Sequence, residues 1–158
     1  MKVIKVVILC VVALTAAPAL AQDKAADTNM QILLEKVKAD KKLVVAANMD
    51  LSEAEGKAFW PIYESYQKDL QGINARLGKT ILAYADAYNK NTLSDAQAKQ
   101  LTDEVLAIDQ DEITLRKTYA ARLGGVIPGT KVARYLQIEN KIRAAIRYDL
   151  ASGIPLVP

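Results

Sequence analysis

Residues 51–89 read LSEAEGKAFWPIYESYQKDLQGINARLGKTILAYADAYN, and this stretch decides the fold. Large apolar side chains recur in it every three or four residues, at Phe59, Tyr63, Tyr66, Leu70, Ile73, Leu77, Ile81, Tyr84 and Tyr88. An α-helix turns once in about 3.6 residues, so these side chains share one helical face. Their mean spacing is also about 3.6 residues per turn, which predicts a nearly straight helix rather than a supercoiled one.

The start and the end of this long helix carry their own signals. Ser52 and Glu55 have the spacing of a capping box, in which the hydroxyl and the carboxylate bond to each other's backbone amides. Pro61 lies two turns further on and lacks an amide hydrogen, so we expect a kink near it. The polar residues 89–92 predict a turn.

Two further helices flank the first. Residues 29–47 have a moderately clear apolar face, and Asn48 is a plausible left-handed stop. After the turn, Ser94 and Gln97 form a second capping-box pattern. An apolar stripe follows, with Glu112 in its one gap, until glycines 124 and 125 end it.

A last helix is expected near the C-terminus, capped by Thr130 and ended by Gly153. We find no alternating β-branched pattern, and so predict no sheet. The fold class is therefore all-α: an elongated antiparallel helical hairpin or bundle of about four helices, kinked near Pro61. Residues 22–158 are expected to form a single domain. A helix as long as the one over residues 53–90 leaves much apolar surface near solvent, which is typical of a partner or ligand site.

The first 21 residues have the pattern of a secretory signal peptide. Lys2 and Lys5 precede an apolar run, and Ala19-Leu20-Ala21 is a small-x-small cleavage site. The run is too short for a membrane span, so we expect residues 1–21 to be cleaved and no transmembrane segment to remain. Export then places the protein in the periplasm.

Composition excludes several kinds of chemistry. The chain has no His and one Cys, and this Cys10 leaves with the predicted signal peptide. Without His, a hydrolytic triad is excluded; a Ser–Lys dyad stays formally open, although no motif supports it. We therefore expect neither an enzyme nor a cofactor. Basic and acidic residues nearly balance once Lys2 and Lys5 are removed, which gives no indication of nucleic-acid binding.

An acidic cluster of the second long helix has two interpretations. Its members are Asp103, Glu104, Asp109, Asp111 and Glu112. Carboxylate oxygens could bind a hard cation. The cluster has no glycine turn, however, so we favour a solvated face with a Glu112–Arg116 pair one helical turn apart, and predict no metal site.

Tyrosines and arginines supply the candidate protein-binding surface. Tyrosine rings suit a half-exposed, adaptable surface, and the last helix is basic. At helical spacing, tyrosines are more often core, and a basic face is more often merely solvated. The candidate surface residues are Tyr63, Tyr66, Tyr84, Tyr88, Arg134, Arg143 and Arg147.

The order of segments, with Leu51-Ser52-Glu53-Ala54-Glu55 opening the long helix, resembles the Spy/CpxP group of periplasmic helical proteins, the LTxxQ-motif class. Residues 59–63, 135–142 and 154–157 also look like a recurring set of exported proteobacterial proteins. The resemblance implies a cradle-shaped all-helical protein and leaves both a monomer and a homodimer open. Members of the group act as ATP-independent holdases, envelope-stress adaptors or metal-responsive sensors. The metal-responsive branch relies on His or Cys, so metal sensing is not expected here.

Two functions follow as expectations. The first is a non-enzymatic periplasmic binding protein, chaperone-like, whose partners are unfolded clients or other envelope proteins. The alternative is a structural or signalling partner of one dedicated envelope protein.

Overall fold

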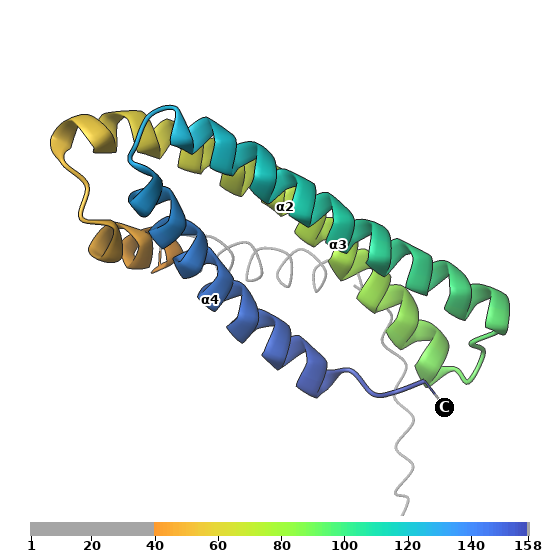
Figure 1. The fold of residues 1–158 in the computed structure, drawn as a ribbon. Helices are drawn as coiled ribbons and strands as arrows, with labels where there is room; N and C mark the ends of the chain where they lie inside the picture. The colour runs from red at the N-terminus through yellow and green to blue at the C-terminus, as the bar shows by residue number, and fades with distance from the viewer. Residues whose placement is uncertain (1–39, 158) are drawn as a thin grey trace, which may run out of the picture. The chain divides into compact units, whose positions relative to one another are not determined.

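The computed structural model describes residues 40–157, which are helical apart from short turns and a C-terminal tail (Figure 1). Three long helices follow one another: α2 (Glu53–Asn89), α3 (Asp95–Gly124) and α4 (Gly129–Gly153). Residues 40–49 form the end of a further helix, and no strand occurs among the described residues. The predicted all-α fold is therefore confirmed. The predicted signal peptide and residues 22–39 lie outside the described residues.

The start of α2 forms as the sequence predicts. Ser52 Oγ accepts a hydrogen bond from Glu55 N at 3.3 Å, and a Glu55 carboxylate oxygen accepts one from Ser52 N at 2.8 Å. This is a complete capping box. The helix then continues without a break through Pro61, and the kink expected there stays a prediction. Beyond Asn89, the chain turns at Asn91, whose φ of 53° is left-handed.

The ends of the other helices confirm some expectations and correct two. Ser94 caps α3 by accepting from Gln97 N, which is half of the predicted capping box. Thr130 does not cap α4; Pro128 is the N-cap, and its carbonyl accepts from the amides of residues 131 and 132. Thr130 already lies inside the helix.

The second correction concerns the end of the first described helix. It runs through Met49, so Asn48 is not its stop. The Asn48 side-chain amide instead donates to Val44 O at 2.7 Å, a bond to the preceding turn of the helix. The left-handed residue is Asp50, with a φ of 48°. Asn and Asp both adopt the left-handed conformation more readily than most residues, and here Asp50 adopts it rather than Asn48.

The helices α2 and α3 lie side by side as a long antiparallel hairpin, joined by the short turn after Asn89 (Figure 1). The helix α2 alone is about 56 Å long at 1.5 Å per residue. From the far end of α3, the chain turns back into α4, which packs against α3. Large side chains bridge α4 to α2: the Tyr135 ring contacts Phe59, Tyr63 and Tyr66.

The core lies at one end of this hairpin, which we call the closed end. Here the beginning of α2, the end of α3, the beginning of α4 and residues 43–49 come together. The buried side chains are Val45, Met49, Phe59, Tyr63, Tyr66, Leu70, Tyr119, Leu123, Ile127, Val132 and Tyr135. Aromatic rings dominate them and meet mostly edge to face, which is a favourable arrangement for their quadrupoles.

Candidate functional site

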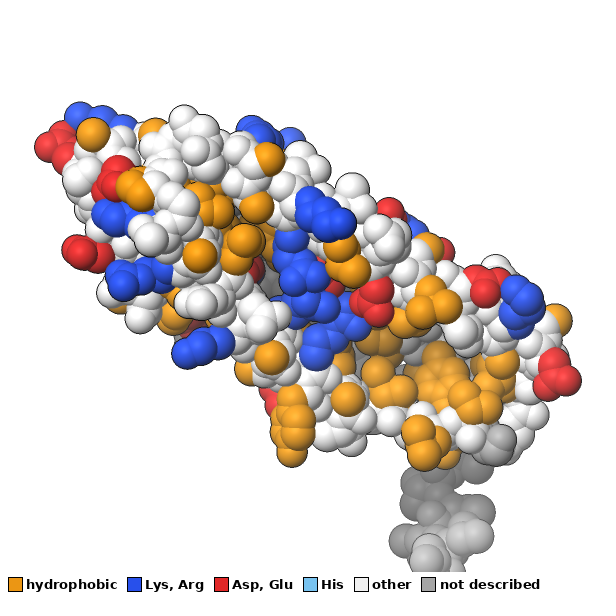
Figure 2. Space-filling view, in the orientation of Figure 1, with side chains coloured by type: hydrophobic (Ala, Val, Ile, Leu, Met, Phe, Trp, Pro, Cys, Tyr) orange, Lys and Arg blue, Asp and Glu red, His pale blue; other side chains and the backbone are white. Residues whose placement is uncertain are grey.

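The opposite end of the hairpin, near the α2–α3 turn, holds an open apolar pocket. Its volume is about 490 Å³. Its walls come from the last turns of α2, the first half of α3, the end of α4 and the C-terminal tail. Figure 2 shows a broad group of hydrophobic side chains in this part of the molecule. The lining residues are Leu77, Thr80, Ile81, Tyr84, Leu93, Ala98, Leu101, Thr102, Val105, Leu106, Arg147, Leu150, Ala151, Ile154, Pro155, Leu156 and Val157.

Every hydroxyl group in this lining already bonds to the protein itself. Thr80 Oγ1 donates to Arg76 O at 3.0 Å, and Thr102 Oγ1 donates to Ala98 O at 2.9 Å. Tyr84 Oη donates to Pro155 O at 3.0 Å. This last bond ties the C-terminal tail to α2 and so forms one wall of the pocket. The walls consequently present hydrocarbon to a ligand, apart from Arg147.

Exposed apolar side chains surround the pocket. Leu106 is 62% exposed and Leu156 is 90% exposed, and both also line it. Leu82, one residue after the lining residue Ile81, is 71% exposed. Soluble proteins rarely expose large contiguous apolar areas without a partner or ligand. This end of the hairpin is therefore the candidate binding site.

A group of ion pairs lies between α3 and α4. Glu112 is only 5% exposed, and its carboxylate contacts Arg143 Nε at 2.6 Å and Arg147 Nη2 at 3.1 Å. Arg147 Nη2 also bonds to Asp109 Oδ1 at 2.6 Å. The contact from Arg143 Nε is close but lacks the angle of a hydrogen bond. These pairs fix α4 to the middle of the hairpin.

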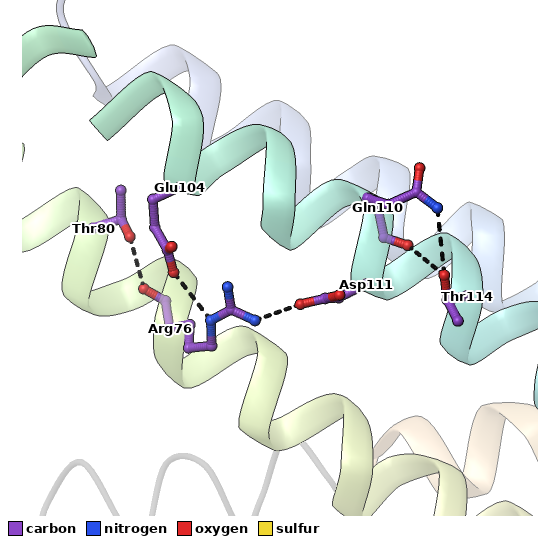
Figure 3. A network of polar contacts seen from close by, with 6 residues as sticks. All are labelled: Arg76, Thr80, Glu104, Gln110, Asp111 and Thr114. Carbon is purple, nitrogen blue, oxygen red and sulfur yellow. Dashed lines mark hydrogen bonds and ion pairs between the residues drawn. The ribbon is translucent and has the colours of Figure 1, made fainter. Parts of the chain in front are cut away.

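A second set of ion pairs joins α2 to α3, and Figure 3 shows it from close by. Arg76 Nε donates to Glu104 Oε1 at 3.0 Å, and Arg76 Nη1 bonds to Asp111. The two carboxylates hold the pKa of the Arg76 guanidinium above its ordinary value, chiefly through these hydrogen bonds. Arg76 thus bridges two acidic residues of the predicted cluster, which lie two helical turns apart on α3.

The predicted solvated acidic face is therefore wrong in part. Glu112 is buried because it pairs with arginines of α4, and Asp111 and Glu104 face α2. Among the described residues, no group of three or more acidic or thiol side chains is placed to hold a metal ion.

The candidate protein-binding surface divides among three places, and two of its members are wrong. Tyr63 and Tyr66 are 3% and 2% exposed, because Tyr135 and Tyr119 cover their rings. Burial raises the pKa of both phenols, and the nearby Glu139 carboxylate adds to this. They belong to the core of the closed end.

The other candidates are more accessible. Tyr84 and Tyr88 are half-buried and their rings lie 5.8 Å apart, with Tyr84 in the pocket wall. Arg134 is exposed near the helical residues 44–48 at the other end of α4. Arg143 and Arg147 are about one-third exposed and form the ion pairs with Glu112, and Arg147 also lines the pocket.

Sequence reasoning missed the pocket and the interior ion pairs. The signal for the ion pairs was present, because Glu112 and Glu139 interrupt the apolar stripes of α3 and α4. Glu139 is 4% exposed and accepts a hydrogen bond from Gln67 Nε2 at 2.9 Å. A carboxylate in an apolar stripe needs a partner on a facing helix, and basic residues were available on α4. No comparable signal marked the tail residues 154–157 as a pocket wall.

None of the helices in the described part of the chain has a stretch sufficiently long and apolar to span a bilayer. No protein-family model, no curated protein and no solved structure matches the chain.

Proposed function

We propose that the chain is a periplasmic, non-enzymatic helical binding protein of chaperone-like type, which holds apolar segments of other proteins without ATP. The observation that carries this proposal is the open apolar pocket, with exposed leucines at its border. The likeness to the Spy/CpxP group and the periplasmic location, which follows from the pattern of residues 1–21, are parts of the same proposal.

Packing explains why this end of the hairpin is suited to capture. The closed end is filled by residues from four segments, whereas among residues 40–157 the pocket end is covered only by the end of α4 and a short tail. Apolar side chains of a client can enter the pocket while the client's main chain stays at its mouth, in contact with Leu82 and Leu106. Burial of this apolar surface supplies the favourable free energy, and no ATP is needed.

The test measures aggregation of a chemically unfolded client by light scattering, with the purified protein in several-fold molar excess. We expect slower aggregation, and we expect Leu82→Gln combined with Leu106→Gln to weaken the effect. Leu43→Gln is the matched control, because Leu43 is 68% exposed and does not line the pocket. A protein without any effect on aggregation would contradict the proposal.

The defined size of the pocket favours a second candidate function, in which the protein is a structural or signalling partner of one envelope protein. A concave pocket of about 490 Å³, even one open to solvent, selects among ligands more strongly than a broad flat surface does. Crosslinking in cells followed by affinity purification separates the two functions. One stoichiometric partner, with no effect on generic clients, would favour this second candidate.

A further inference from the structure

We infer that the pocket binds a single aliphatic chain of an anionic amphiphile, such as a fatty acid or a lysophospholipid. This inference goes beyond the proposed function, because the ligand is a small molecule rather than a protein. It also stands without that function, since it depends on the volume of the pocket, the chemistry of its walls and one arginine.

The volume fits one chain. Small-molecule pockets in proteins usually measure about 300–1,000 Å³, and this pocket measures about 490 Å³. An apolar cavity of about 150 Å³ in another protein holds one benzene molecule, so by proportion the present pocket has room for about twenty carbon atoms. A medium-length chain fits, whereas a complete two-chain phospholipid exceeds the space.

The walls favour a hydrocarbon chain over a peptide main chain. The hydroxyls of Thr80, Thr102 and Tyr84 all donate to backbone carbonyls, and the other lining residues except Arg147 have apolar side chains. An extended peptide placed inside would bring amide and carbonyl groups that find no partner, which is costly in an apolar site. An aliphatic chain brings no such groups.

Arg147, whose charge is shared with Asp109 and Glu112, supplies hydrogen-bond donors for the headgroup. Its Nη2 bonds to Asp109 and Glu112, while its Nε and Nη1 make no hydrogen bond with the described residues. The side chain is 32% exposed and belongs to the pocket lining. Two guanidinium nitrogens, which carry three N–H groups, are therefore available to a carboxylate or a phosphate whose chain lies in the pocket.

The experiment titrates the protein, as purified from cells, with a fluorescent fatty acid and then displaces this probe with octanoate, decanoate, laurate and myristate. All ligands are kept below their micelle-forming concentrations. We expect one saturable site, and an affinity that rises up to about fourfold for each added methylene until the chain outgrows the pocket. Laurate should bind about threefold or more tightly than dodecyltrimethylammonium, because only laurate can accept from Arg147.

Two matched substitutions on α3 locate the site. Ala98 lines the pocket, so Ala98→Phe should fill part of it and weaken laurate binding about tenfold. Ala107 is exposed and does not line the pocket, so Ala107→Phe should leave binding unchanged. Circular dichroism checks that both variants fold. If Ala98→Phe does not fold, the inference is tested by the dependence of affinity on chain length and by the comparison of laurate with dodecyltrimethylammonium.

Several results would overturn the inference. They are the absence of saturable binding, an affinity independent of chain length, or equal weakening by the two phenylalanine variants. Parallel titrations with laurate and with lauroyl lysophosphatidylglycerol identify which source of the chain is preferred. Client aggregation is measured separately, so the two proposals can fail independently.

Discussion

The two ends of the α2–α3 hairpin differ in what covers their apolar stripes. At the closed end, residues 43–49, the beginning of α4 and a group of aromatic rings fill the space and leave side chains such as Phe59 without exposure. At the pocket end, the same two helices continue the same apolar stripes, but of the part of the chain that the structure describes only the end of α4 and the tail lie over them. The comparison indicates that the tightly packed core lies at the closed end, whereas the pocket end holds the candidate binding site, so we expect that each can be changed separately.

The largest effect is expected from Phe59→Ala. Phe59 is fully buried and its ring contacts Trp60, Tyr63 and Tyr135. Removing a buried phenyl group leaves a cavity, so we expect the free energy of unfolding to fall by about 3–5 kcal/mol. Chemical denaturation with circular dichroism measures this change.

The matched control is Leu106→Ala, which shortens a side chain of the pocket wall that is 62% exposed. We expect it to lower the free energy of unfolding by about 1 kcal/mol or less, because little of the side chain is removed from water in the folded state. Equal losses for the two substitutions would contradict the division between the two ends.

The second prediction concerns the ion pairs that fix α4 between the two ends. Glu112→Gln removes the negative charge that Arg143 and Arg147 face at 2.6 and 3.1 Å. Both arginines are about a third exposed, which limits the cost relative to a fully buried pair. We expect a loss of about 2 kcal/mol in the free energy of unfolding, and about 0.5 kcal/mol or less for the exposed control Asp103→Asn. An unchanged unfolding midpoint for Glu112→Gln would show that these pairs do not hold α4.

These residues also show what could be predicted from the sequence. The capping box at Ser52 and the spacing of the apolar stripe are local patterns, so the helices and their hairpin could be predicted. The spacing of the apolar stripe could not predict that Tyr63 is buried in the core whereas Tyr84 lies in the pocket wall. That distinction depends on which distant segment covers each tyrosine: Tyr135 lies over Tyr63, and Pro155 reaches only the hydroxyl of Tyr84.

The same reasoning explains why the ion-pair partner of Glu112 was predicted wrongly. Local spacing favoured a Glu112–Arg116 pair within one helix, whereas the structure pairs Glu112 with arginines of the next helix, α4. The sequence of one helix indicates that a carboxylate lies in its apolar stripe. Which basic residue pairs with that carboxylate depends on how the helices pack.

The third prediction uses pH to probe the closed end. Lys131 Nζ bonds to Glu55 Oε2 and to Asp50 O, each at 2.6 Å, and so ties the start of α4 to the start of α2. The hydrogen bond from Lys131, with help from the Ser52 amide, lowers the pKa of Glu55 from 4.5 to about 2. Below pH 4.5 the unfolded chain therefore takes up a proton that the folded protein does not.

Stability from this group is fully present above pH 4.5 and is lost as the pH falls toward 2. Glu55→Gln should remove this part of the acid dependence, so that its unfolding midpoint changes less than that of the parent protein across the same window. Glu53→Gln is the control, since Glu53 is exposed and its one ion pair with the described residues is to Lys57, one turn away. An identical pH profile for Glu55→Gln and the parent protein would show that the Lys131 contact does not couple the two helix starts.

The smallest effect on stability is expected from Tyr84→Phe at the pocket end. The substitution removes only the hydroxyl that donates to Pro155 O at 3.0 Å, at an exposed position. We expect a change of about 1 kcal/mol or less in the free energy of unfolding. The tail, however, should be held less firmly, since Leu156 and Val157 are themselves mostly exposed.

Trimming of the C-terminus by a carboxypeptidase measures this local release: it should be faster in Tyr84→Phe than in the parent protein. Tyr148→Phe is the control, because Tyr148 is exposed on α4 and does not line the pocket. Faster trimming with an unchanged unfolding midpoint would sharpen the comparison, because it would show that the pocket wall opens without any loss at the closed end. If Tyr84→Phe instead lowered the unfolding midpoint of the whole protein along with faster trimming, the two ends would unfold as one unit.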